Sequence, residues 1–227
     1  TAGILLLLLG SVIGGYIAYS LNFPTTLVAI IAVAIISVVG YSKIFAASGL
    51  GEILVALNFG PLLTAGTYYV QTGATKISTE SIYIGLITGL LTAGILYINQ
   101  FPDTTADISK GRRHLVARLG KKRAVTGFKI VVSLAYVVLA VGIATGILPV
   151  LTALGLLTIP QSRTTFKLLD NNYEEIEKLI PAMGNNVKTT IVTSALILVG
   201  YAITVLIFQY WGFELTPYIG GYSADGV

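Results

Sequence analysis

The chain has 227 residues, of which 55% are hydrophobic and only 11% are charged, and its mean hydropathy is +0.85. Soluble globular domains carry about 25% charged residues, so this composition excludes that class and indicates an integral membrane protein. Cysteine is absent and His114 is the single histidine, which excludes a disulfide framework, a thiol nucleophile and a multi-histidine metal site.

Long apolar runs recur along the chain, and their uniformity predicts membrane-spanning helices rather than the alternating strands of an outer-membrane barrel. We expect an all-α polytopic bundle with seven spans, near residues 2–21, 27–39, 53–70, 82–98, 125–148, 150–160 and 190–211. The second and sixth runs are short and are expected to extend into their flanks. Helix ends or kinks are expected at Pro24, Pro61, Pro149 and Pro160, and close helix packing at Gly85, Gly89 and Gly94.

Seven spans place the segments 43–50, 101–123 and 161–189 on one side of the membrane. These segments carry twelve of the fourteen Lys and Arg residues, so the positive-inside rule predicts that this side is cytoplasmic. Within the third segment, residues 170–180 alternate acidic and apolar side chains. They predict a short amphipathic helix at the membrane surface, either a solvated connector or a lid.

A polar segment follows the fourth span directly, and it begins at Asn99, which we expect to face the polar side. Asp103 and Asp107 are four residues apart, so they share a face of a helix. Carboxylate oxygens of this kind can hold Mg²⁺ together with phosphate oxygens. The basic cluster that follows, Lys110, Arg112 and Arg113, can contact phosphate directly. Topology alone would explain the basic residues, but it does not explain the two aspartates. The segment therefore predicts a lipid-diphosphate site.

Residues 99–120 read NQFPDTTADISKGRRHLVARLG. They resemble the second aspartate-rich motif of the UbiA superfamily of membrane prenyltransferases, in which Asn precedes Asp-x-x-x-Asp and a basic stretch ends in Arg-Leu-Gly. A second stretch, residues 49–73, reads GLGEILVALNFGPLLTAGTYYVQTG. It resembles the 1,4-dihydroxy-2-naphthoate prenyltransferase branch of that superfamily.

The resemblance implies about nine transmembrane helices around a central cavity with a cytoplasmic cap. It also implies two Mg²⁺ ions that bridge a prenyl diphosphate and two aspartate-rich motifs, with Asp103 and Asp107 as the ligands from the second motif. The first motif, Asn-Asp-x-x-Asp, does not occur in these residues. We therefore expect the chain, residues 1–227, to be the C-terminal seven-helix portion of a single domain and to be inactive by itself.

Five further residues are candidates for contacts in the site. Lys43 is expected to touch the diphosphate or simply to set topology, and Asn58 to line the cavity or to pack helices. Tyr68 is expected to line the cavity or to belong to the interfacial aromatic belt. Glu52 suits either the positive end of a helix dipole or the site. His114 is expected to contact phosphate or solvent.

The function implied is transfer of a polyprenyl group, for example from geranylgeranyl diphosphate, to an aromatic acceptor such as 1,4-dihydroxy-2-naphthoate in quinone biosynthesis. Within the superfamily, 4-hydroxybenzoate, geranylgeranylglyceryl phosphate, chlorophyllide and haem remain alternative acceptors. A transporter without catalysis is the alternative from another class. The expected partners are the two substrates and the lipid bilayer, without nucleic acid.

Overall fold

The computed structural model describes residues 2–45 and 48–211, and the side chains of Ser42, Lys43 and Trp211 are not among those described. The described elements are all helical. In chain order they are α1 (Ala2–Ser20), α2 (Thr25–Gly40), η1 (Tyr41–Phe45), α4 (Gly51–Leu57), η2 (Asn58–Leu62), α5 (Leu63–Gln71), α6 (Thr79–Ser109), α7 (Leu115–Leu119), α8 (Lys121–Ala144), η3 (Val150–Thr158), α9 (Ile159–Asn172) and α10 (Ile176–Trp211).

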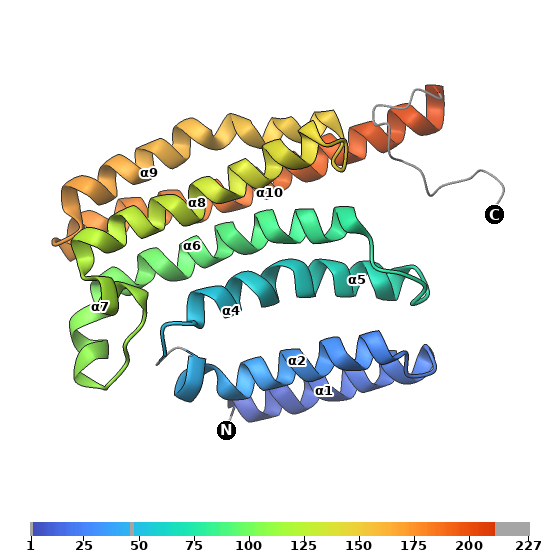
Figure 1. Cartoon of the computed structure of the whole chain (residues 1–227), viewed down its shortest axis with the longest axis horizontal. Helices are drawn as coiled ribbons and strands as arrows, with labels where there is room; N and C mark the ends of the chain where they lie inside the picture. The colour runs from blue at the N-terminus through green and yellow to red at the C-terminus, as the bar shows by residue number, and fades with distance from the viewer. Residues whose placement is uncertain (1, 46–47, 212–227) are drawn as a thin grey trace.

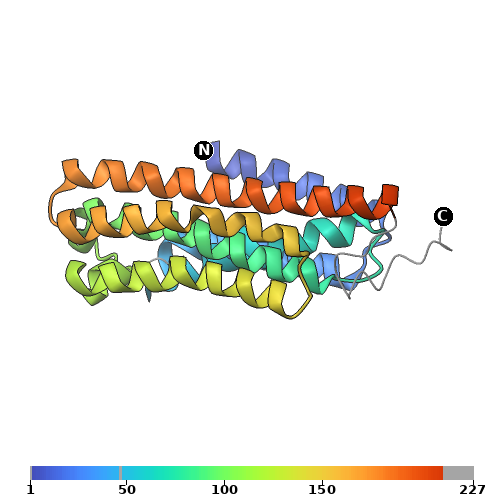
Figure 2. The same ribbon diagram turned by 90° about the horizontal axis from the view of Figure 1, so that it is seen from above.

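Several of these elements join end to end, so the described chain forms seven long rods. Successive rods run antiparallel to one another (Figure 1). Viewed from above, the rods form one elongated bundle (Figure 2). Five rods are long and apolar enough to cross a membrane, namely α1, α4–η2–α5, α6, α8 and α10, and α2 is a shorter apolar helix. The seven spans predicted from hydropathy each fall in one rod.

The predicted ends of these spans are less accurate. The segments 101–123 and 161–189, which connect the predicted spans, are largely helical. α6 continues to Ser109, and α9 and α10 occupy most of the second segment. Hydropathy reports where the chain leaves the lipid, whereas a helix continues as long as its backbone bonds and packing are satisfied. The 31 residues of α6 extend over roughly 46 Å, well beyond a hydrocarbon core of about 30 Å. α6 is therefore longer than a perpendicular crossing of the hydrocarbon core requires.

The short amphipathic helix predicted at residues 170–180 is wrong. α9 ends at Asn172 and α10 begins at Ile176, so this segment is the turn of a helical hairpin. The backbone N–H of Glu175 donates to the Asn172 carbonyl at 2.9 Å and closes the turn. The alternation of acidic and apolar residues reflects two helix ends that meet at the surface. It does not mark a separate lid.

Glycine lets α6 contact the α4–η2–α5 rod almost backbone to backbone. A Cβ at Gly89 would collide with the Ala56 carbonyl, and one at Gly85 would collide with Thr64 and Pro61. Pro61 and Gly60, whose φ and ψ are both −113°, kink the rod at this contact. The predicted kink at Pro61 is confirmed, as is the predicted close packing at Gly85 and Gly89.

On the other side of α6, the half of the bundle formed with α8, α9 and α10 has a packed core. It contains the fully buried rings Tyr97, Phe101 and Phe128 and a buried hydroxyl network in which Tyr136 meets Thr158 at 2.9 Å. Two apolar grooves flank α2, one of about 460 Å³ and one of about 470 Å³. Neither groove is lined by the aspartates, which instead lie at one end of the bundle.

Candidate functional site

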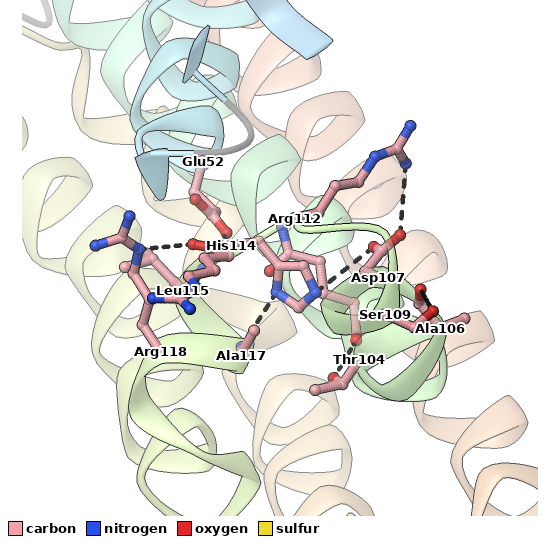
Figure 3. Close-up of polar contacts among 12 residues, drawn as sticks. Glu52, Thr104, Ala106, Asp107, Ser109, Arg112, His114, Leu115, Ala117 and Arg118 are labelled. Carbon is pink, nitrogen blue, oxygen red and sulfur yellow. Dashed lines mark hydrogen bonds and ion pairs between the residues drawn. The ribbon is translucent and has the colours of Figure 1, made fainter. Parts of the chain in front are cut away.

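The aspartate pair lies where the C-terminal end of α6 meets α7 and the first turn of α4 (Figures 1 and 3). Asp103 is exposed, and the side chain of Asp107, one turn further on, is 19% exposed. Both project from the same face of α6 because they are four residues apart. The basic loop, which we define as residues 110–113, follows directly, and Lys110, Arg112 and Arg113 are all exposed.

A tight reversal of the backbone directs the basic loop back toward Asp107. The N–H of Arg112 donates to the Asp107 carbonyl at 2.9 Å, and the N–H of Gly111 donates to the Ile108 carbonyl at 3.0 Å. These two bonds form a Schellman motif, which needs a left-handed residue, and Gly111 has φ +75°. As a result, the Arg112 guanidinium lies 3.4 Å from the Asp107 carboxylate. A guanidinium and a carboxylate thus lie side by side at the end of α6.

His114 lies on the other side of Asp107 (Figure 3). The residue is 4% exposed, so of the two expected contacts, with phosphate or with solvent, the one with solvent is wrong. Nδ1 accepts the Ala117 N–H at 3.3 Å and caps α7, while Nε2 lies 3.6 Å from Asp107 Oδ2. Burial lowers the pKa of His114, although Asp107, Glu52 and Asp103 act to raise it. The lowered pKa agrees with an Nδ1 atom that is unprotonated and accepts a hydrogen bond.

The two sequence stretches that carry the family resemblance meet in space. Glu52, at the start of α4, accepts the Leu115 backbone N–H on Oε1 at 3.2 Å, across 63 residues of chain. Beside it, Arg118 Nε donates to the Arg113 carbonyl at 2.6 Å. A Cβ at Gly49 would come within 2.9 Å of that Nε atom, so Gly49 gives the arginine room. The Glu52 side chain therefore stabilises α7 as well as lying in the first turn of its own helix.

A polar stripe leads from Asp107 into the bundle. Tyr97, Gln100, Thr104 and Asp107 are spaced by three, four and three residues, so they follow one face of α6. The first three are buried, and Tyr97 Oη and Gln100 Oε1 have no hydrogen-bond partner within the described residues. The spacing of these four polar residues at three or four positions is visible in the sequence and could have predicted the stripe.

Tyr41 belongs to η1. Burial and the charge of Glu52 raise the pKa of Tyr41, and the charge of Arg112 lowers it. Lys43 follows two residues later in η1, but its side chain lies outside those described. Asn99 is half-buried one turn before Asp103 on α6.

Two other candidate residues lie away from the aspartates. Asn58 donates its amide to Ser37 Oγ on α2 at 3.1 Å and to the Leu54 carbonyl at 2.8 Å. The structure thus places Asn58 in a contact between helices. Tyr68 lies in α5, sixteen residues beyond Glu52 in the same rod and roughly 24 Å along its axis. α5 runs toward the end of the bundle opposite α7 (Figure 1).

The side chains near the aspartates can be compared with the ligands that Mg²⁺ needs. Within residues 2–45 and 48–211, no group of three or more His, Asp or Glu side chains is placed to hold a metal ion. Asp103 and Asp107 therefore offer carboxylate oxygens from two residues only. Mg²⁺ commonly binds in this way, through one or two carboxylates together with substrate phosphates and water. The described residues fit Mg²⁺ that is shared with a phosphate ligand, and by themselves they do not complete a metal site.

The profile of the UbiA prenyltransferase family matches residues 1–186. The chain belongs to this family. Its helical rods and its family membership make it a multi-pass membrane protein. The resemblance read from the two sequence stretches is thereby confirmed at the level of the family.

Individual relatives agree with the naphthoate branch. The chain is 26% identical over 133 residues to a 2-carboxy-1,4-naphthoquinone phytyltransferase of Synechocystis, covering 58% of this chain and 42% of that protein. It is 37% identical over 90 residues to a 1,4-dihydroxy-2-naphthoate octaprenyltransferase of Haemophilus influenzae, covering 38% and 29% of the two chains. The matches thus span less than half of either relative. No solved structure gives a significant match.

Proposed function

We propose that the protein containing this chain transfers a polyprenyl group from a prenyl diphosphate to a 1,4-dihydroxy-2-naphthoate-like acceptor in quinone biosynthesis. The observation that carries the proposal is the pairing of Asp103 and Asp107 with the adjoining basic loop at one end of the bundle. Membership of the UbiA family supports prenyl transfer, and the names of the relatives support a naphthoate acceptor.

In this proposal, Lys110, Arg112 and Arg113 bind the oxygens of the diphosphate. Asp103 and Asp107 would hold Mg²⁺, which, when bound, neutralises charge on the departing diphosphate. The bond between the prenyl carbon and the diphosphate oxygen breaks, and the electron pair leaves with the diphosphate. A ring carbon of the acceptor then bonds to the allylic cation and releases a proton.

We further propose that this end of the bundle faces the cytoplasm. Seven basic residues lie between positions 110 and 123 there, whereas Lys76 is the basic residue in the α5–α6 turn at the opposite end. This asymmetry favours a cytoplasmic site by the positive-inside rule. It also argues against a transporter, in which charged groups near the middle of the membrane would be expected.

The first experiment uses the complete protein in detergent with Mg²⁺, labelled geranylgeranyl diphosphate and 1,4-dihydroxy-2-naphthoate. We expect prenylated naphthoate from the wild type and about a hundredfold slower turnover from Asp103→Asn and from Asp107→Asn, because each substitution weakens binding of the cation. The matched control is Asp170→Asn. Asp170 forms an exposed ion pair with Lys129 at 2.6 Å, and its loss is expected to change turnover little.

The alternatives give different results in the same assay. Release of diphosphate without prenylated naphthoate would reject this acceptor and direct the assay to 4-hydroxybenzoate and the other acceptors. If no acceptor supports Mg²⁺-dependent turnover, the hypothesis that the protein is an enzyme is rejected. Equal activity in Asp107→Asn and Asp170→Asn would reject the proposed metal ligands.

A further inference from the structure

Glu52 is the one Asp, Glu, Lys or Arg side chain that is buried among those described, with 3% of its surface exposed. Burial of a carboxylate is costly unless hydrogen bonds or opposite charge compensate for it. Glu52 Oε1 accepts a hydrogen bond from the Leu115 N–H, the first N–H of α7, at 3.2 Å. Oε2 has no hydrogen-bond partner within the described chain. Because burial of the Glu52 carboxylate costs free energy and the residue lies near Asp107, we expect a role beyond helix packing.

The contact acts on the basic loop through the start of α7. At its beginning, the loop is anchored by the Schellman bonds around Gly111. At its end, Glu52 holds the Leu115 N–H, His114 caps α7, and Arg118 holds the Arg113 carbonyl. The four residues of the loop are therefore tied on both sides. Without the Glu52 bond, the end of the loop would lose a link to α4, and the arginines would be ordered less firmly before an anion binds.

We propose that Glu52 is a positioning residue for the diphosphate site, acting through α7 to hold Arg112 and Arg113 beside Asp107. This inference rests on the proposed function, because it assigns the loop to diphosphate. Its role is distinct from general stability, since α4 also packs against α6 through the glycine contact at Ala56 and Gly89, well inside the bundle. The bundle is expected to survive the loss of the Glu52 bond.

The test compares Glu52→Gln with Glu52→Leu in the complete protein. Glutamine keeps an oxygen that can accept the Leu115 N–H, whereas leucine keeps the approximate volume and removes the acceptor. The matched control is Glu80→Leu, which removes another glutamate from the first turn of a helix. Glu80 accepts the Ser78 hydroxyl at 2.8 Å at the opposite end of α6.

Three experiments are made. They measure hydrogen exchange over residues 110–119, the affinity for inorganic diphosphate with Mg²⁺ by calorimetry, and the KM and kcat for prenyl diphosphate. For Glu52→Leu we expect faster exchange, about tenfold weaker diphosphate binding and a KM raised by a similar factor. In Glu52→Gln, the exchange rate, the diphosphate affinity and the KM should stay close to the wild-type values. Glu80→Leu should leave them unchanged.

Each contrary result is decisive. Unchanged exchange and diphosphate affinity in Glu52→Leu would overturn the proposal, and so would a loss of kcat at constant KM, which indicates fewer folded molecules. A Glu52→Gln variant as impaired as Glu52→Leu would show that the charge matters and the hydrogen bond does not, which also overturns it. If the wild type binds diphosphate but prenylates no acceptor, the proposed function fails while the positioning role stands.

Discussion

At the scale of single residues, backbone geometry around Gly111 decides where the charges of the site lie. The left-handed conformation at this position closes the last turn of α6 and brings the Arg112 guanidinium to Asp107. His114 and Glu52 then act on the start of α7 with one hydrogen bond each. Lys110, Arg112 and Arg113 are exposed, whereas Glu52 and His114 are buried. The local geometry is therefore as necessary to the site as its charges.

Replacing Gly111 with alanine tests this geometry. Because an L-residue resists a φ of +75°, we expect Gly111→Ala to destabilise the folded state by about 1 kcal/mol and to weaken binding of diphosphate. Unfolding in detergent and calorimetry measure the two effects. The control is Gly184→Ala, at a helical position where an added Cβ meets no atom within 4 Å. Similar behaviour of the two variants would contradict the argument.

At the scale of elements, the position of the site depends on how closely α6 approaches the α4–η2–α5 rod. Glu52 lies on one rod and Asp107 on the other, so the spacing of the two rods sets the geometry between them. That spacing is small because glycines face each other where side chains would otherwise intervene. Close contact of small residues is a common source of helix association in membranes.

A methyl group at Gly89 should separate these rods. Its Cβ would collide with the Ala56 carbonyl, which is backbone and cannot rotate away. We expect Gly89→Ala to destabilise the protein by about 2 kcal/mol and to reduce activity through the displaced Glu52. Thermal unfolding and turnover measure this, with Gly15→Ala as control, because an added Cβ at Gly15 meets no atom within 4 Å. A Gly89→Ala variant as stable and active as the control would refute the close contact.

At the scale of the whole molecule, the bundle is asymmetric along its length. One end carries the last turns of α6, the α9–α10 hairpin and the basic loop, and the other end carries the short turns after α1, α5 and α8 (Figure 1). Such a distribution suits a protein that admits charged substrates from one side and apolar chains from the lipid. The orientation proposed above assigns the charged end to the cytoplasm.

Residues 1–227 contain no cysteine, so a single cysteine introduced among them can report this orientation. We expect a membrane-impermeant maleimide to label Thr75→Cys in spheroplasts and Ser109→Cys in inverted membrane vesicles, since the two exposed positions lie at opposite ends of the bundle. Permeabilised membranes, in which both should react, serve as the control. The reverse pattern of labelling would place the aspartates outside the cell.

The sequence by itself determined the membrane class, the number of rods, the aspartate and arginine candidates and the family, because each depends on local composition or on short spacing along one helix. Helix ends were predicted less well, since the polar turns of α6 beyond Ile98 carry no apolar signal although they remain helical. Only the tertiary structure decided that Glu52 holds α7, that His114 is buried against Asp107, and that Asn58 reaches Ser37. These contacts depend on which rods lie side by side. Hydropathy shows that a helix enters the lipid, but it does not show which neighbour its polar side chains will meet.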